Sequence, residues 1–181
     1  METRVTGPAV GPPTLERIRR APKVLLHDHL DGGLRPTSII ELADEHGYRN
    51  LPTTDPAELS QWMLRGANRK DLTLYLETFA HTVGVMQTEA AIHRVARECA
   101  EDLAADGVVY AEIRFAPELH TEQGLSLDAV IEAVLAGFDA GSTSTELTIR
   151  VICSAMRHQN NALEVAQAAV RYRDQGVVAF D

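Results

Sequence analysis

Hydrophobic residues change their spacing along the chain, and the change predicts alternating strands and helices. Short apolar runs that are typical of strands occur at residues 24–30, 108–115, 147–156 and 177–181. Between the later runs, apolar residues recur every three or four positions, as on the buried face of a helix, over 126–141 and 161–173. This alternation predicts an α/β fold in which helices cover a parallel sheet.

Additional helices are predicted between the first and second strands. Their apolar periodicity covers residues 37–46, 55–65, 71–83 and 88–105. Asp55 followed by Pro56 is typical of a helix start, and Gly47 stands where a left-handed residue ends a helix. A short helix that begins at Thr14 precedes the first strand.

A doubly wound sheet and a (β/α)8 barrel both fit this alternation. The turn after the first strand, Asp31-Gly32-Gly33, lacks the G-x-G-x-x-G pattern of a dinucleotide-binding doubly wound sheet. A complete TIM-type barrel has eight strands and about 250 residues, whereas only four strands are predicted here. We therefore favour a (β/α)8 TIM-barrel type fold, of which the chain holds roughly the first half with extra helices after strand 1.

Polar residues at alternate positions of two strands support the barrel. Strict alternation puts Leu25, His27 and His29 on one face of the first strand, and Glu112 and Arg114 on one face of the second. Polar side chains that point into a barrel near the carboxyl ends of its strands are typical of an active site. We expect Glu112 and Arg114 to pair, because either charge buried alone would be costly.

Composition and charge limit the binding partners and the cellular compartment that we expect. Seventeen Lys and Arg against 26 Asp and Glu give a net charge of −9, which repels nucleic acid and anionic membranes but not a small neutral substrate. Cys99 and Cys153 form no C-x-x-C pair, so we expect two free thiols and no zinc cluster. No apolar run approaches the ~20 residues of a membrane span, and the amino terminus lacks the apolar core of a signal peptide. We expect a cytoplasmic protein with a flexible leader over residues 1–13 and one domain over 14–181.

His27-Asp28-His29 is the strongest sign of chemistry in the sequence. Residues two apart on a strand emerge on the same side, so both imidazoles can bind one metal ion. Zinc accepts neutral His nitrogens and, in catalytic sites, keeps one position open for water. Two surface histidines can show this spacing without a function, but this pair ends an apolar strand beside a turn with a carboxylate. Asp31 in that turn would bind a substrate hydroxyl or a group near the metal, or else its own backbone.

Three segments of the chain resemble the adenosine deaminase family. The segment at residues 22–36, PKVLLHDHLDGGLRP, is similar to the one that opens these enzymes. Other amidohydrolases share H-x-H, but the longer motif H-x-H-L-D-G is much more specific to this family. YAEIRFAPELH at 110–120 and Met-Arg-His at 156–158 are similar as well. The resemblance spans about residues 14–181, in order, and is strongest to bacterial members.

The resemblance implies zinc-dependent hydrolytic deamination of adenosine and deoxyadenosine to inosine and ammonia. It makes His27 and His29 two of the ligands of a single zinc ion, and it puts His29 and Asp31 against the ribose of the nucleoside. Zinc lowers the pKa of its water towards about 7 and so supplies a nucleophile. The implied partner is a purine nucleoside, with no nucleic acid and no membrane.

Several residues of the family have no counterpart in this sequence. The H-A-G-E motif with the general-acid Glu is absent, and the remaining metal ligands and the catalytic His and Asp would lie beyond residue 181. We therefore assign no catalytic residue, and we expect a truncated and catalytically incomplete form of the enzyme.

Other polar and aromatic residues receive secondary roles. His120, His158 and Glu118 follow strands at the same end of the predicted sheet, and we expect them to make hydrogen bonds in loops instead of binding metal. Trp62 and Met63 are candidates for an apolar lid over the purine, with helix packing as the alternative.

Two further functions stay open. The site could belong to a related amidohydrolase, such as an adenine deaminase, which a screen of purines would separate from the first hypothesis. Alternatively, the chain could be a non-catalytic half-barrel that associates with a second copy or with a complementary half, because a four-stranded half leaves sheet edges open.

Overall fold

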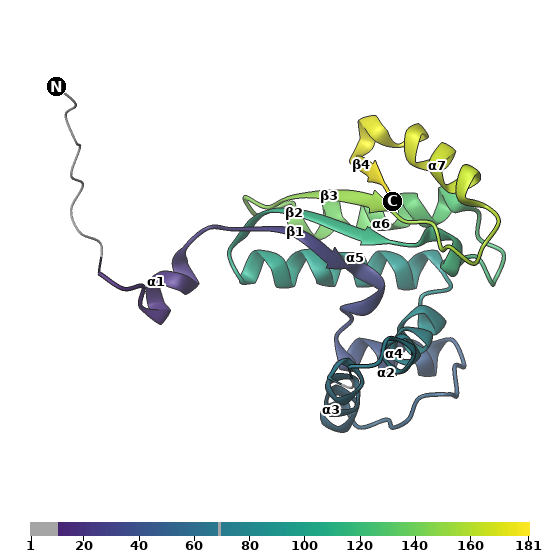
Figure 1. Ribbon diagram of the computed structural model, residues 1–181, viewed down its shortest axis with the longest axis horizontal. Helices are drawn as coiled ribbons and strands as arrows, with labels where there is room; N and C mark the ends of the chain where they lie inside the picture. The colour runs from purple at the N-terminus through teal and green to yellow at the C-terminus, as the bar shows by residue number, and fades with distance from the viewer. Residues whose placement is uncertain (1–10, 69) are drawn as a thin grey trace.

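The computed structural model describes residues 11–68 and 70–181, and a parallel four-stranded sheet lies at its centre (Figure 1). Residues 1–10 of the predicted leader lie outside the described residues. The strands are β1 (Lys23–His29), β2 (Val108–Phe115), β3 (Thr148–Cys153) and β4 (Val177–Phe180). All four predicted strands are therefore present.

The order of the strands separates the two predicted architectures. The sheet runs β1-β2-β3-β4, and each neighbouring pair is parallel. In a doubly wound sheet the order reverses at a switch point, whereas in a barrel each new strand is added on the same side. The observed order is that of a segment of a barrel.

Besides the strands, the described part of the chain forms seven α-helices and three short 3-10 helices. The α-helices are α1 (Leu15–Arg20), α2 (Pro36–Glu45), α3 (Pro56–Ala67), α4 (Leu72–Val85), α5 (Glu89–Ala105), α6 (Leu127–Ser142) and α7 (Ala162–Arg171). The 3-10 helices are η1 (Leu30–Gly32), η2 (Pro117–His120) and η3 (Arg173–Gln175). The first two follow β1 and β2 directly, where the sequence predicts functional residues.

Local capping determines where the helices begin. The side chains of Thr14, Asp55, Thr88 and Ser126 each accept a hydrogen bond from the backbone N–H three residues later. Gly47, the predicted helix stop, has a positive φ of 70°. These starts and the stop agree with the sequence-based predictions.

The hydrophobic core lies between the sheet and the helices. Ala111, Ile113 and Phe115 alternate along β2 as buried residues, and the contacts of β2 with α5 and of β3 with α6 cover this face. The helices α2, α3 and α4 form a separate group beyond the carboxyl end of β1, and α1 lies beyond its amino end (Figure 1). Among the described helices, none has the length and apolar character needed to cross a membrane.

Candidate metal and substrate site

His27 and His29 lie together at the carboxyl end of β1. Their ring centroids are 5.5 Å apart, and both residues are exposed. Two imidazoles that bind one zinc ion tetrahedrally through Zn–N bonds of about 2.1 Å have ring centres about 5 Å apart. The spacing and the donor type therefore suit two ligands of one zinc ion.

A bulge in β1 determines which side chains lie on the same face of the strand as the two histidines. Leu25 pairs with Ala111 of β2. Asp28 pairs with Ile113, so β1 uses three residues where β2 uses two. Such a bulge interrupts the alternation, and Leu25 accordingly packs against the core on the helix-covered face. The prediction that Leu25 shares a face with the two histidines was wrong.

Asp31 occupies η1 and is buried. Its Oδ2 accepts a hydrogen bond from the backbone N–H of Ala116 at 3.3 Å, which joins the turn after β1 to the residue that follows β2. Its Oδ1 lies 3.8 Å from His29 Nδ1 and has no hydrogen-bond partner among the described residues. One oxygen is thus anchored, and the other keeps its capacity to accept a hydrogen bond from a ligand.

Polar side chains of β2 line the same face as the histidines. His29 is the register partner of Arg114, whose Nη1 donates to Asp181 Oδ2 at 2.5 Å. The Glu112 carboxylate accepts a hydrogen bond from the Tyr110 hydroxyl at 2.8 Å. Arg114 and Glu112 therefore have these partners instead of each other, which corrects the predicted pair. The role of Asp181 depends on a side-chain contact between β2 and the residue that follows β4, which spacing along one strand does not reveal.

His120 and Glu118 are buried next to the end of β2. His120 Nδ1 lies 3.0 Å from the Met86 carbonyl oxygen, which only accepts hydrogen bonds, so this nitrogen carries the proton. Burial lowers the pKa of His120 below its ordinary value, and the charge of Asp31 opposes that shift. Glu118 Oε1 accepts from the backbone N–H of Met156 at 2.5 Å and joins two loops. Both residues make hydrogen bonds in loops, in line with the roles expected for them.

Phe79 on α4 is an aromatic neighbour of the site that sequence reasoning missed. Its ring lies 6.2 Å from the His29 ring, edge to face, and a Cβ on Gly32 would lie 2.8 Å from it. Trp62, for which the sequence offers helix packing or a lid, lies 5.2 Å from the ring of His81, so it packs α3 against α4. The apolar periodicity of α4 contains Phe79, but it does not tell which helix faces the end of β1.

The donor set of the site is incomplete within the described residues. No group of three or more His, Cys, Asp or Glu side chains there is arranged to hold a metal ion. Burial raises the pKa of Cys99 and of Cys153 to about 12, which keeps both thiols protonated. His27 and His29 therefore fit part of a zinc site, and further ligands are needed to complete it.

Comparison with known proteins agrees with this geometry. The family model for adenosine deaminase matches residues 22–181. A curated adenosine deaminase of Mycolicibacterium gilvum is 60% identical over 175 residues, which cover 94% of this chain and 48% of the relative. The chain thus spans about half the length of the curated relatives that it matches.

Solved structures match over a similar fraction of this chain and about half of their own chains. The Arabidopsis N6-mAMP deaminase superposes with a TM-score of 0.77 at 27% identity and covers 92% of this chain and 51% of its own. An amidohydrolase from Burkholderia ambifaria, solved with bound zinc, has a TM-score of 0.75, 23% identity and coverage of 93% and 46%, and so it supports the fold alone. The sheet and helices correspond to half of an amidohydrolase TIM barrel.

Proposed function

The chain belongs to the adenosine deaminase family, and from this premise we propose that it carries the β1 part of a zinc-dependent site that deaminates adenosine and deoxyadenosine to inosine and ammonia. The observation that carries the proposal is the 5.5 Å spacing of the His27 and His29 rings beside the free oxygen of Asp31. The same residues lie in the segment that matches the family.

His27 and His29 would hold the metal in this proposal. Zinc, when bound, supplies a Lewis acid that lowers the pKa of water near a purine ring. Neutral imidazole nitrogens are donors that zinc accepts. Asp31 Oδ1 lies 3.8 Å from His29 Nδ1, which is beyond hydrogen-bond distance, so this oxygen stays available to a ligand. Since the described residues offer no third metal-binding group, the complete site would take its other ligands from outside them.

Asp31 would bind the ribose. A carboxylate with one oxygen fixed by the Ala116 N–H has a defined orientation, and its second oxygen can accept a hydrogen bond from a hydroxyl group. His29 forms the other side of this position, and the Phe79 ring adds an apolar wall. This combination suits a sugar hydroxyl that lies between a carboxylate and an aromatic ring.

A chimaera tests the proposed function. This chain would replace the matched half of the Mycolicibacterium gilvum relative, and inosine formation from adenosine would be followed by ultraviolet absorbance with zinc present. We expect activity, and we expect His27→Ala and His29→Ala to lower kcat/KM by roughly a thousandfold, because several kcal/mol of metal-dependent stabilisation would be lost. The 181-residue chain alone should give negligible inosine.

Two comparisons make the chimaera result decisive. His158→Ala removes an exposed histidine from a loop after β3 and should leave kcat/KM unchanged. N6-methyl-AMP, offered in parallel, separates adenosine deamination from the activity for which the Arabidopsis relative is named. Adenine, offered in the same way, tests the alternative of an adenine deaminase. An active chimaera that is insensitive to both histidine substitutions would refute the proposed ligands, and a preference for another purine would refute the proposed substrate.

A further inference from the structure

Asp28 stands between the two proposed zinc ligands in the sequence and contacts one of them. Its Oδ1 accepts a hydrogen bond from the backbone N–H of His29 at 2.9 Å. A carboxylate that accepts from a backbone N–H makes a charge-assisted hydrogen bond, which is stronger than one between neutral groups. The Asp28 side chain therefore acts on the peptide group of His29 and not on its imidazole.

The Asp28 side chain lies on the opposite face of β1 from the two imidazoles. Asp28 is the register partner of Ile113, which is buried on the helix-covered face, and Asp28 is half-buried where both histidines are exposed. Burial and, after it, the charge of Asp28 raise the pKa of the Cys99 thiol on α5. Asp28 thus faces α5, and it is not placed to be a third ligand of an ion between the histidines.

The strand is irregular where Asp28 and His29 interact. The register shift between Leu25 and Asp28 interrupts the pairing of β1 with β2. His29 is the last residue of β1 and directly precedes η1. β1 also lies at the edge of the described sheet, so β2 is its one neighbour there. Because bulges redirect side chains and weaken the regular ladder, the hydrogen bond from Asp28 restrains His29 where the sheet restrains it less.

We propose that Asp28 is a positioning residue for the metal site. Its carboxylate fixes the N–H of His29 and, through the backbone, holds the His29 imidazole 5.5 Å from that of His27. Groups that orient metal ligands change metal affinity by about 10- to 100-fold when they are removed. The inference rests on the proposed function, since it requires that both imidazoles bind one ion.

Two substitutions at Asp28 separate the hydrogen bond from the charge. Asp28→Asn keeps an oxygen that accepts from the His29 N–H, whereas Asp28→Val removes it, and both remove the negative charge. Without zinc, we expect the His29 amide to exchange with solvent about tenfold faster in the valine variant than in the asparagine variant, as measured by NMR. In a zinc titration followed by the histidine ring signals, the valine variant should have a Kd about tenfold higher than the asparagine variant.

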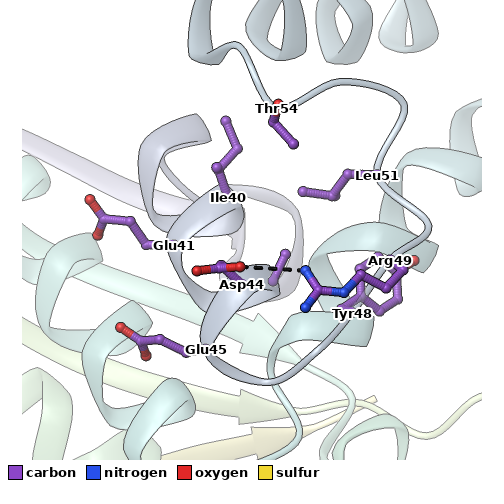
Figure 2. A pocket seen from close by; sticks show the side chains of 9 residues that line it. Ile40, Glu41, Asp44, Glu45, Tyr48, Arg49, Leu51 and Thr54 are labelled. Atoms are coloured by element: carbon purple, nitrogen blue, oxygen red, sulfur yellow. Dashed lines mark hydrogen bonds and ion pairs between the residues drawn. The ribbon is translucent and has the colours of Figure 1, made fainter.

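Asp44→Asn and Asp44→Val are the matched controls. The Asp44 carboxylate pairs with Arg49 at 3.4 Å in a groove formed by α2 and the loop that follows it (Figure 2). None of the residues that line this groove belongs to β1, so the two variants should bind zinc with equal affinity. Circular dichroism checks the fold of each variant, and Asp28→Ala replaces Asp28→Val in the comparison if the valine variant does not fold.

The outcomes distinguish this inference from the proposed function. Equal amide exchange or equal zinc affinity in the two Asp28 variants would overturn the positioning role alone. A parent chain in which zinc leaves the ring signals of both His27 and His29 unchanged would overturn the proposed function and the positioning role together.

Discussion

His120 shows how one buried side chain makes the fold sensitive to pH. Its ring is fully buried, packs 6.1 Å from the ring of Phe115 and donates from Nδ1 to the Met86 carbonyl. Asp31 and Glu122 favour its protonated form electrostatically, but desolvation outweighs them and lowers the pKa of His120. The folded chain therefore holds this imidazole neutral at a pH at which the unfolded chain begins to protonate it.

Stability should fall as the pH is lowered from about 7 to 5. An unfolded histidine has a pKa near 6.5, and the folded value is lower, so the unfolded state binds more protons in this range and gains stability relative to the folded state. Urea unfolding at a series of pH values measures the effect. His120→Phe should flatten the dependence, whereas His158→Phe, at an exposed loop position, should not. An equally steep dependence in His120→Phe would contradict this account.

At the scale of elements, local signals were predictable from the sequence and contacts between elements were not. Caps such as Thr14 and Asp55 depend only on residues within one turn, so the sequence predicts them. The bulge after Leu25 depends on the register of β1 against β2, which strict alternation cannot supply. The H-x-H spacing predicted the histidine pair because both residues lie in one strand. Phe79 and the contact of Arg114 with Asp181 were missed because they depend on contacts between elements.

The close packing of α5 against α6 predicts that replacing a helical glycine by alanine destabilises the protein, which is the opposite of the usual effect. A Cβ at Gly137 would lie 2.7 Å from the Ala96 Cβ and even closer to the His93 carbonyl oxygen. Alanine normally stabilises a helix by about 1 kcal/mol relative to glycine, but overpacking costs about 1–3 kcal/mol. Gly137→Ala should therefore lower the free energy of unfolding by about 1 kcal/mol.

Denaturant unfolding of two variants separates the packing from the helix propensity. Ala136→Gly changes the preceding, exposed residue of α6 and should cost about 1 kcal/mol, which sets the propensity scale at this place in the helix. If Gly137→Ala stabilised the protein by a similar amount, the close approach of α5 and α6 would be refuted.

At the scale of the whole molecule, the strand–helix alternation predicted the parallel sheet but left its order open. The absence of a glycine-rich loop favoured the barrel, and the order β1-β2-β3-β4 agrees with it. The curated relatives that the chain matches are about twice as long as the chain. The function proposed for the pair therefore depends on whether His27 and His29 bind one ion together.

Zinc titration followed by NMR of ¹⁵N-labelled histidine side chains tests that claim most directly. We predict that the ring signals of His27 and His29 shift together and saturate at one zinc per chain, and that His27→Asn weakens the response of His29. Separate saturation of the two rings would contradict the account. So would a zinc response led by His46 or His158 with the β1 pair unchanged.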